Sequence, residues 1–120
     1  IQADGGTRVA SITGAYVALV DAISWLKKNA EITGEPLVGS VAAVSVGVVG
    51  SVPLLDLCYE EDVTADVDMN IVLTGDGEYI ELQGTAEKQT FSEEELAQMM
   101  RHAKKGISEL TLIQKDALQG

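Results

Sequence analysis

The chain has 120 residues, of which 46% are hydrophobic and 22% are charged, and its formal net charge is −11. This length argues against more than one domain, the composition is ordinary for a globular protein, and no apolar run reaches the length of a membrane span. The acidic balance argues against a simple nucleic-acid-binding face, because affinity for a polyanion comes from clustered lysine and arginine.

The charge is unevenly distributed along the chain. Residues 51–97 contain 13 acidic residues and one lysine, whereas the remaining parts are almost balanced. The single cysteine, Cys58, cannot form an internal disulfide, which favours a reducing compartment. The opening residues show neither an initiating methionine nor the pattern of a secretory signal. We therefore expect a cytoplasmic protein, with this chain as a fragment of it.

The first predicted element is a helix from Arg8 to about Ala30. The segment is rich in alanine and leucine and is apolar almost all round, a pattern typical of a helix buried between other elements. Lys27 and Lys28 complement the helix dipole in the last turn, and Pro36 follows in a segment that breaks helices. We expect a sandwiched helix that ends near Ala30.

Two β-hairpins are predicted to follow the helix. Valine-rich segments at residues 38–49 and 52–59 are joined at Gly50 and Ser51, which is the pattern of two strands with a tight connection. Further along, residues 69–74 and 78–87 flank a Gly-Asp-Gly turn, whose residues tolerate the positive φ of hairpin turns. The middle of the chain is therefore predicted to be a four-stranded antiparallel unit.

The last predicted element is a helix that opens at Ser92. Ser92 and Glu95 have the spacing of a capping box, and three glutamates suit the positive end of the dipole. We expect Gly106 to end this helix, with the cations that precede it complementing its dipole. The order αββββα, with the strands in hairpins, predicts an α+β fold over residues 1–120: an antiparallel four-stranded sheet covered by two helices.

The loop before the first helix has the features of an anion-binding site. Two glycines, Gly5 and Gly6, precede Thr7 and Arg8. The N–H groups at a helix N-terminus are unpaired, glycines let a ligand approach them, and an arginine can bind two phosphate oxygens at once. An ordinary structural alternative remains, because Thr7 is also a normal N-cap residue and glycine pairs are common in loops.

The acidic stretch YEEDVTADVDMN, residues 59–70, runs directly into a predicted buried strand. Asp62 and Asp68 lie six residues apart in it, with Asp66 between them. Such carboxylates suit Mg²⁺ or Mn²⁺, which bind one or two of them and keep waters and substrate phosphates as further ligands. They could equally position or donate a proton to a leaving oxygen. A solvated acidic loop is the alternative, and it is the more frequent outcome of such a charge run.

Three other residues were considered as site candidates. His102 has no cysteine or acid partner at ligand spacing, so it is a weak candidate for metal binding. Cys58 lies in a predicted strand, where it is expected to pack as a small apolar group. Trp25 is expected in the core or in an interface. None of the three enters the predicted site.

Several segments, taken together and in order, resemble the C-terminal half of bacterial ribonuclease PH, a family of phosphorolytic exoribonucleases. The resemblance spans nearly the whole chain and rests on QADGGTR, ITGAYVALVDA, VAAVSVGVV, LLDLCYEED, DMNIVLT and ELQGTAE. It implies half of a ribonuclease PH-type fold (ribosomal protein S5 domain 2-like). It also implies an enzyme that uses inorganic phosphate to trim the 3′ end of transfer-RNA precursors and releases nucleoside diphosphates.

The resemblance also implies roles for individual residues. Gly6, Thr7 and Arg8 would bind the attacking phosphate. Asp62 and Asp68 would bind Mg²⁺ or Mn²⁺, or would assist departure of the 3′ oxygen. Family members assemble as hexameric rings, trimers of dimers, and no membrane is involved. The resemblance therefore implies three partners: an RNA 3′ end, inorganic phosphate and further copies of the chain.

Two departures from the family pattern are visible. Val63 stands where the family commonly has a serine, and residues 88–90 replace a small acidic stretch. Two other functions stay open. One is a non-catalytic ring subunit, or an inactive half-domain, of the same family. The other is an acidic metal-binding module without a role in RNA metabolism, which the acidic segment favours and the GGTR motif disfavours.

Overall fold

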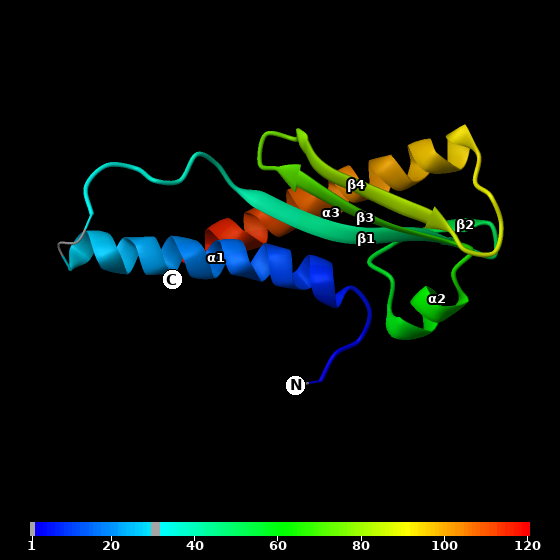
Figure 1. Ribbon diagram of the computed structural model, residues 1–120, viewed down its shortest axis with the longest axis horizontal. Helices are drawn as coiled ribbons and strands as arrows, with labels where there is room; N and C mark the ends of the chain where they lie inside the picture. Colours follow the sequence, from blue (N-terminus) through cyan, green and yellow to red (C-terminus); the bar gives the residue numbers. More distant parts are fainter. Residues whose placement is uncertain (1, 30–31) are drawn as a thin grey trace.

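The computed structural model describes residues 2–29 and 32–120 (Figure 1). Its elements are α1 (Thr7–Lys28), β1 (Val41–Val49), β2 (Val52–Leu55), α2 (Tyr59–Thr64), β3 (Val67–Thr74), β4 (Tyr79–Ala86) and α3 (Glu93–Gln119). The strands form one antiparallel sheet in the order β2-β1-β3-β4. The α+β fold and the main order αββββα predicted from the sequence are confirmed, with the short α2 as an addition.

Both predicted hairpins are present, although the first one is shorter than predicted. Gly50 and Ser51 have φ values of 55° and 65°, as a two-residue hairpin turn with positive φ at both positions demands. The first strand begins at Val41 instead of Val38, and the second ends at Leu55 instead of Tyr59. The second strand ends there because Asp56 adopts a φ of 61°, which takes the chain out of the extended conformation.

Helix α2 was not predicted, because its residues were assigned to a strand end and an acidic loop. The Cys58 N–H donates to Glu61 Oε2 at 2.9 Å, which forms one half of a capping box, and acidic residues fill the first turn. Cys58 is therefore the N-cap of a helix and not, as predicted, an apolar residue of a strand. Six residues are too few for a helical periodicity to be visible in the sequence.

The main core lies between the sheet and α3. Its buried members are Ala42, Val44, Val46, Val48, Val67, Met69, Ile71, Leu73, Met99, Ala103 and Ile107. Gly106 belongs to this contact and does not end the helix, contrary to the prediction. A Cβ added at Gly106 would lie 2.9 Å from Leu55 Cδ1, so the glycine allows α3 to approach β2 closely. The predicted capping box at Ser92 is confirmed.

Helix α1 packs against the opposite face of the sheet, but only near its start. Val9 is its one buried residue among those described, and it contacts Ala43 and Val72. Leu19 and Trp25 are 50% and 62% exposed, and Figure 1 shows the second half of the helix projecting beyond the sheet. The prediction of a sandwiched helix is therefore wrong for this chain. An apolar pattern predicts that a helix is covered, but it does not identify the element or the partner that covers it.

The end and the composition of α1 give two further results. The helix ends at Lys28, and the predicted end near Ala30 lies outside the described residues. By length and composition alone α1 could cross a membrane, since an 18-residue window has a mean hydropathy of 1.6. Helices from the cores of soluble proteins often have the same composition, so this finding does not assign a membrane span.

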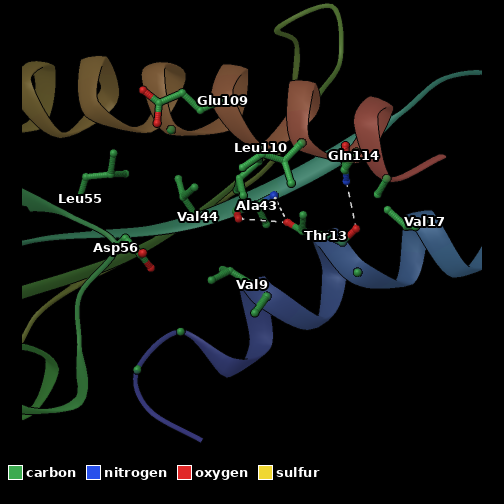
Figure 2. A pocket seen from close by; sticks show the side chains of 17 residues that line it. Val9, Thr13, Val17, Ala43, Val44, Leu55, Asp56, Glu109, Leu110 and Gln114 are labelled. Carbon is green, nitrogen blue, oxygen red and sulfur yellow. Dashed lines mark hydrogen bonds between the residues drawn. The ribbon is translucent and has the colours of Figure 1, made fainter. Parts of the chain in front are cut away.

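The side chains of Thr13 and Gln114 form hydrogen bonds with backbone groups of β1 at the edge that β2 leaves unpaired. Strand β2 pairs with β1 only from Val46 onward. Before that point Thr13 Oγ1 accepts from the Ala43 N–H at 3.1 Å and donates to the Ala43 carbonyl at 3.3 Å. Gln114 Nε2 donates to the Val41 carbonyl at 2.9 Å and to the Thr13 carbonyl at 3.0 Å, and Figure 2 shows the second of these bonds. Residues from α1 and α3 thus satisfy backbone groups that would otherwise be buried without partners.

Candidate functional site

The predicted anion-binding loop leads directly into α1. Gly6 is the N-cap residue, with a φ of 69°, and Thr7 is the first residue of the helix. Thr7 is therefore not the N-cap, which was the structural alternative for this position. In the described part of the chain no side chain caps this helix end. Its first backbone N–H groups therefore have no side-chain partner, and such unpaired donors can bind an anion at a helix N-terminus.

The same loop packs against the beginning of α2. The Tyr59 N–H donates to Asp4 Oδ1 at 2.6 Å. Gly5 lies so close to this segment that a Cβ there would collide with the carbonyl oxygen of Leu57. The loop that leads into GGTR and the segment that opens the acidic stretch are therefore in direct contact, although more than 50 positions separate them.

The carboxylates of the acidic stretch divide into two groups. Glu61 completes the capping box of α2, and Asp66 Oδ2 accepts from the Gly50 N–H at 3.2 Å in the first hairpin turn. These two side chains serve local structure. Asp62 lies on α2 and Asp68 on β3, and both are half-buried. They are the two carboxylates that were predicted from the sequence as metal ligands and catalytic residues.

Asp68 lies on the sheet face that α1 covers. Alternate residues of a strand share a face, so Asp68 points to the same side as Val72, against which Val9 of α1 packs. Gly47 is its register partner on β1, and a Cβ at Gly47 would collide with the Val67 carbonyl oxygen. The start of α1 and the Asp68 carboxylate therefore share one side of the sheet.

The environment of Asp68 disfavours a second negative charge beside Asp62. Burial raises the pKa of Asp68, and the charge of Asp62, a hydrogen bond with Asp62 and the charge of Glu87 raise it further. No group of three or more histidine, cysteine or acidic side chains at metal-binding distance occurs within residues 2–29 and 32–120. Two adjacent carboxylates nevertheless fit Mg²⁺, which completes its shell with water and substrate phosphate.

Arg8 reaches across the sheet face to β4. Its Nη2 donates to Glu81 Oε2 at 2.7 Å and to Oε1 at 3.0 Å, and the pair is largely exposed. The guanidinium group has five N–H donors, so an anion can bind the same group from another side. Sequence reasoning missed Glu81, because a separation of 73 residues leaves no spacing signal.

Cys58 lies beside Glu60 and Glu61 at the start of α2 and is not a reactive thiol. The Glu61 backbone N–H alone would lower the pKa of Cys58, but desolvation and the carboxylates of Glu60 and Glu61 outweigh it and raise that pKa. A thiol with a raised pKa remains protonated near neutral pH and is a poor nucleophile. Cys58 therefore adds no nucleophile to the candidate site.

The two departures from the family pattern both lie at α2. The Val63 side chain is exposed on α2. Lys88 Nζ donates to the Thr64 carbonyl at 2.9 Å and so binds the C-terminal end of α2. A cation suits this helix end, because its carbonyls carry the negative end of the dipole. Lys88 thus supports the element that carries Asp62.

A groove of ≈ 590 Å³ runs between α1 and α3 (Figure 2). Gly5 and Gly6 line one end of it, and Val17 and Ala117 lie further along. Figure 2 shows mainly aliphatic side chains along its walls, with Gln114 bridging the helices. Neither Asp62 nor Asp68 lines the groove, so the predicted catalytic pair lies outside this concave surface.

Comparisons with known proteins show the family of the chain. Residues 39–106 match the family described as 3′ exoribonuclease family, domain 2. The chain is 58% identical over 118 residues to the ribonuclease PH of Corynebacterium efficiens, which covers 98% of the chain and 48% of that relative. It is 56% identical to the ribonuclease PH of Corynebacterium diphtheriae, over 99% of the chain and 49% of the relative. The chain spans about half the length of the curated relatives it matches.

Proposed function

The chain belongs to the 3′ exoribonuclease family, domain 2, and we propose that it provides the phosphate-binding and acidic part of a phosphate-dependent 3′-to-5′ exoribonuclease. The observation that carries this proposal is the contact between the loop that precedes α1 and the segment that opens α2, made by Asp4 with Tyr59 and by Gly5 with Leu57. The contact supports the proposal because it holds the start of α1 against the start of α2, the helix that carries Asp62. The family resemblance inferred from the sequence motifs is confirmed.

The proposed reaction is phosphorolysis of the last phosphodiester of an RNA. An oxygen of inorganic phosphate forms a bond to the phosphorus of that diester, and the bond from phosphorus to the 3′ oxygen breaks. The 3′ oxygen takes up a proton and remains on the shortened RNA, while the last nucleotide leaves as a nucleoside diphosphate. Precursors of transfer RNA are the proposed substrates, in the cytoplasm.

Gly6, Thr7 and Arg8 are the proposed phosphate-binding residues. The unpaired N–H groups at the start of α1 donate to phosphate oxygens, and the Arg8 guanidinium adds a charged fork. Holding the nucleophile in line with the scissile phosphorus replaces a bimolecular encounter by a reaction within one complex. Glu81 restricts the Arg8 side chain before phosphate arrives.

Asp62 and Asp68 are the proposed catalytic pair and the proposed ligands of Mg²⁺ or Mn²⁺. A bound divalent cation supplies positive charge against the negative charge that builds on the transferring phosphoryl group. The two carboxylates would hold the cation in a fixed position, because their backbones are fixed. Asp62 lies on α2, which Lys88 anchors, and Asp68 lies on β3.

Assembly with further copies of the chain, as a hexameric ring, is part of the same proposal. The exposed Leu19 and Trp25 on α1 support it, since large exposed apolar residues favour burial against a partner. Basic RNA contacts then come from other surfaces, which reconciles RNA binding with the acidity of residues 51–97. The mass of the particle in solution tests the assembly.

The experiment that tests the function measures nucleoside diphosphate release from an RNA with a 3′ tail. The chain is assayed alone and joined to the part of the Corynebacterium efficiens relative that lies outside the matched region. We expect release that requires phosphate and a divalent cation, and we expect Arg8→Ala to abolish it. Arg101→Ala, which removes an exposed arginine from α3, is the matched control and retains activity.

Three results would contradict the proposal. RNA degradation that proceeds equally well without phosphate would replace phosphorolysis by hydrolysis. An inactive chimera that nevertheless assembles and binds RNA would favour a non-catalytic ring subunit, the second function considered for this chain. Binding of Mg²⁺ without any response to phosphate or RNA would favour an isolated acidic metal-binding module.

A further inference from the structure

Ser45 has a buried side chain that the proposed mechanism does not use. The residue is 4% exposed, and within the described residues its Oγ has no hydrogen-bond partner. Its backbone carbonyl is satisfied, because it accepts from the Asp56 N–H at 2.8 Å. Buried hydroxyl groups almost always have a partner, and a serine hydroxyl can both donate and accept. An unpartnered hydroxyl at this position therefore calls for a physical explanation.

Its position relates this hydroxyl to the phosphate loop. Ser45 pairs in register with Asn70, on the sheet face that carries Asp68 and the start of α1. A Cβ built on Gly6 would lie 3.5 Å from Ser45 Oγ. The hydroxyl is thus directed at the N-cap of α1, and the loop above it keeps out water.

The loop can respond to an anion by turning a peptide group. Gly6 has a φ of 69° and no Cβ, so the peptide between Gly5 and Gly6 has more freedom than one between larger residues. In a trans peptide the N–H and the C=O point in opposite directions. When the Gly6 N–H turns outward to an anion, the Gly5 carbonyl oxygen turns inward, toward the side on which Ser45 lies.

We propose that Ser45 is a positioning residue of the phosphate site, whose hydroxyl donates to the Gly5 carbonyl when inorganic phosphate binds at the start of α1. The hydroxyl then stabilises the orientation of the peptide that presents the Gly6 N–H to phosphate. Ser45 acts through the loop and does not touch phosphate itself. This inference rests on the proposed function of Gly6, Thr7 and Arg8.

The proposal and a purely structural role make opposite predictions for Ser45→Ala. Removing a hydroxyl that only packs in the core leaves phosphate affinity unchanged. Removing one that supports the phosphate-bound loop weakens phosphate binding on the order of 10-fold, the worth of one hydrogen bond. Under the proposal the phosphate-free protein does not lose stability, because the hydroxyl has no partner there.

The experiment measures the dissociation constant of inorganic phosphate by calorimetry, and the melting temperature with and without phosphate, at matched ionic strength. It uses the chain and the chimera described above. Ser45→Ala is compared with Ser45→Cys, whose thiol is a weaker donor of similar size, and with Ser108→Ala, which removes an exposed hydroxyl from α3. We expect the loss of affinity to be largest for alanine, smaller for cysteine and absent for Ser108→Ala.

The outcomes separate this inference from the function on which it rests. If Arg8→Ala weakens phosphate binding and Ser45→Ala does not, the role of Ser45 is refuted and the phosphate site stands. If Ser45→Ala lowers the melting temperature without phosphate by as much as with it, the hydroxyl is structural and the inference fails. If the unchanged chain and the chimera both fail to bind phosphate, the site and the role of Ser45 are overturned together.

Discussion

The two faces of the sheet differ in what they bury. The face toward α3 is lined by apolar side chains from β1 and β3 and closes over Met99, Ala103 and Ile107. The face toward α1 buries little more than the contact of Val9 with Ala43 and Val72, and it carries Ser45 and polar residues of β3 and β4. One face holds the fold together, and the other carries the proposed chemistry.

This difference means that stability and function can be changed separately. Packing dominates the free energy of folding, so substitutions on the α3 face are expected to unfold the chain without acting on the site. Substitutions on the α1 face remove polar groups that are unpaired or that repel a neighbour, and their removal does not destabilise the fold. Such groups are retained where function requires them.

The largest expected effect comes from truncating the α3 face. Met99 is fully buried, so Met99→Ala is expected to lower the free energy of unfolding by about 3 kcal/mol through lost contacts and the cavity left behind. Leu19→Ala is the matched truncation on α1 and is expected to change it by less than about 0.5 kcal/mol, because Leu19 is half exposed. Urea unfolding measures both. Equal effects would abolish the contrast between the two faces.

Asp68→Asn is expected to separate stability from activity. Turnover of the chimera should fall by about 100-fold or more, because a carboxylate at the reacting phosphate is lost. RNA binding should remain, while the melting temperature at neutral pH should rise. Asp116→Asn on the exposed side of α3 is the control and changes neither. A variant that is both inactive and less stable would show that Asp68 supports the fold instead.

The stabilisation by Asp68→Asn should depend on pH. The folded state raises the pKa of Asp68, so at neutral pH the charged carboxylate destabilises the fold. As the pH falls through the folded-state pKa, the folded protein binds the proton first and this penalty disappears, completely so below the ordinary value of 3.8. Thermal melts between pH 7 and pH 3 should show the advantage of the variant vanishing on acidification. A constant advantage would exclude a charge effect.

Two helical glycines sharpen the comparison at a smaller scale. A Cβ at Gly14 of α1 would meet nothing within 4 Å, so Gly14→Ala is expected to stabilise the chain by about 0.8 kcal/mol through helix propensity. At Gly106 of α3 the same atom would press on Leu55 and Val44. Crowding there should cancel or reverse the gain. Equal stabilisation by both alanines, measured by urea unfolding, would mean that the two helices are packed equally tightly.

The smallest effect is expected for the ion pair between Arg8 and Glu81. The pair is exposed, so Glu81→Gln should change the free energy of unfolding by less than about 0.5 kcal/mol, and high salt should remove even that change. Chemical denaturation at low and high salt measures it. If Glu81→Gln still lowered the free energy of unfolding in high salt, Glu81 would stabilise the sheet face by packing and not by its charge.

The sequence predicted those features that depend on neighbouring residues. Glycines before a helix, the capping box at Ser92 and the turn at Gly50 were all recognised, because each depends on a few adjacent positions. The six-residue α2 was missed, since it is shorter than two helical turns. The Glu81 partner of Arg8 and the Gly106 contact with Leu55 were missed because they join distant elements.

The hydrogen bond from Gln114 to Thr13 joins residues 101 positions apart, nearly the full length of the chain. Contacts of such high separation form late in folding, after the loop-closure entropy has been offset by other contacts. During synthesis on the ribosome, α1 therefore emerges long before the residue that fastens it to α3 and to the edge of β1. For that interval Val9 and the other residues of α1 that pack on the sheet are also exposed, and a chaperone or a neighbouring nascent chain can bind them.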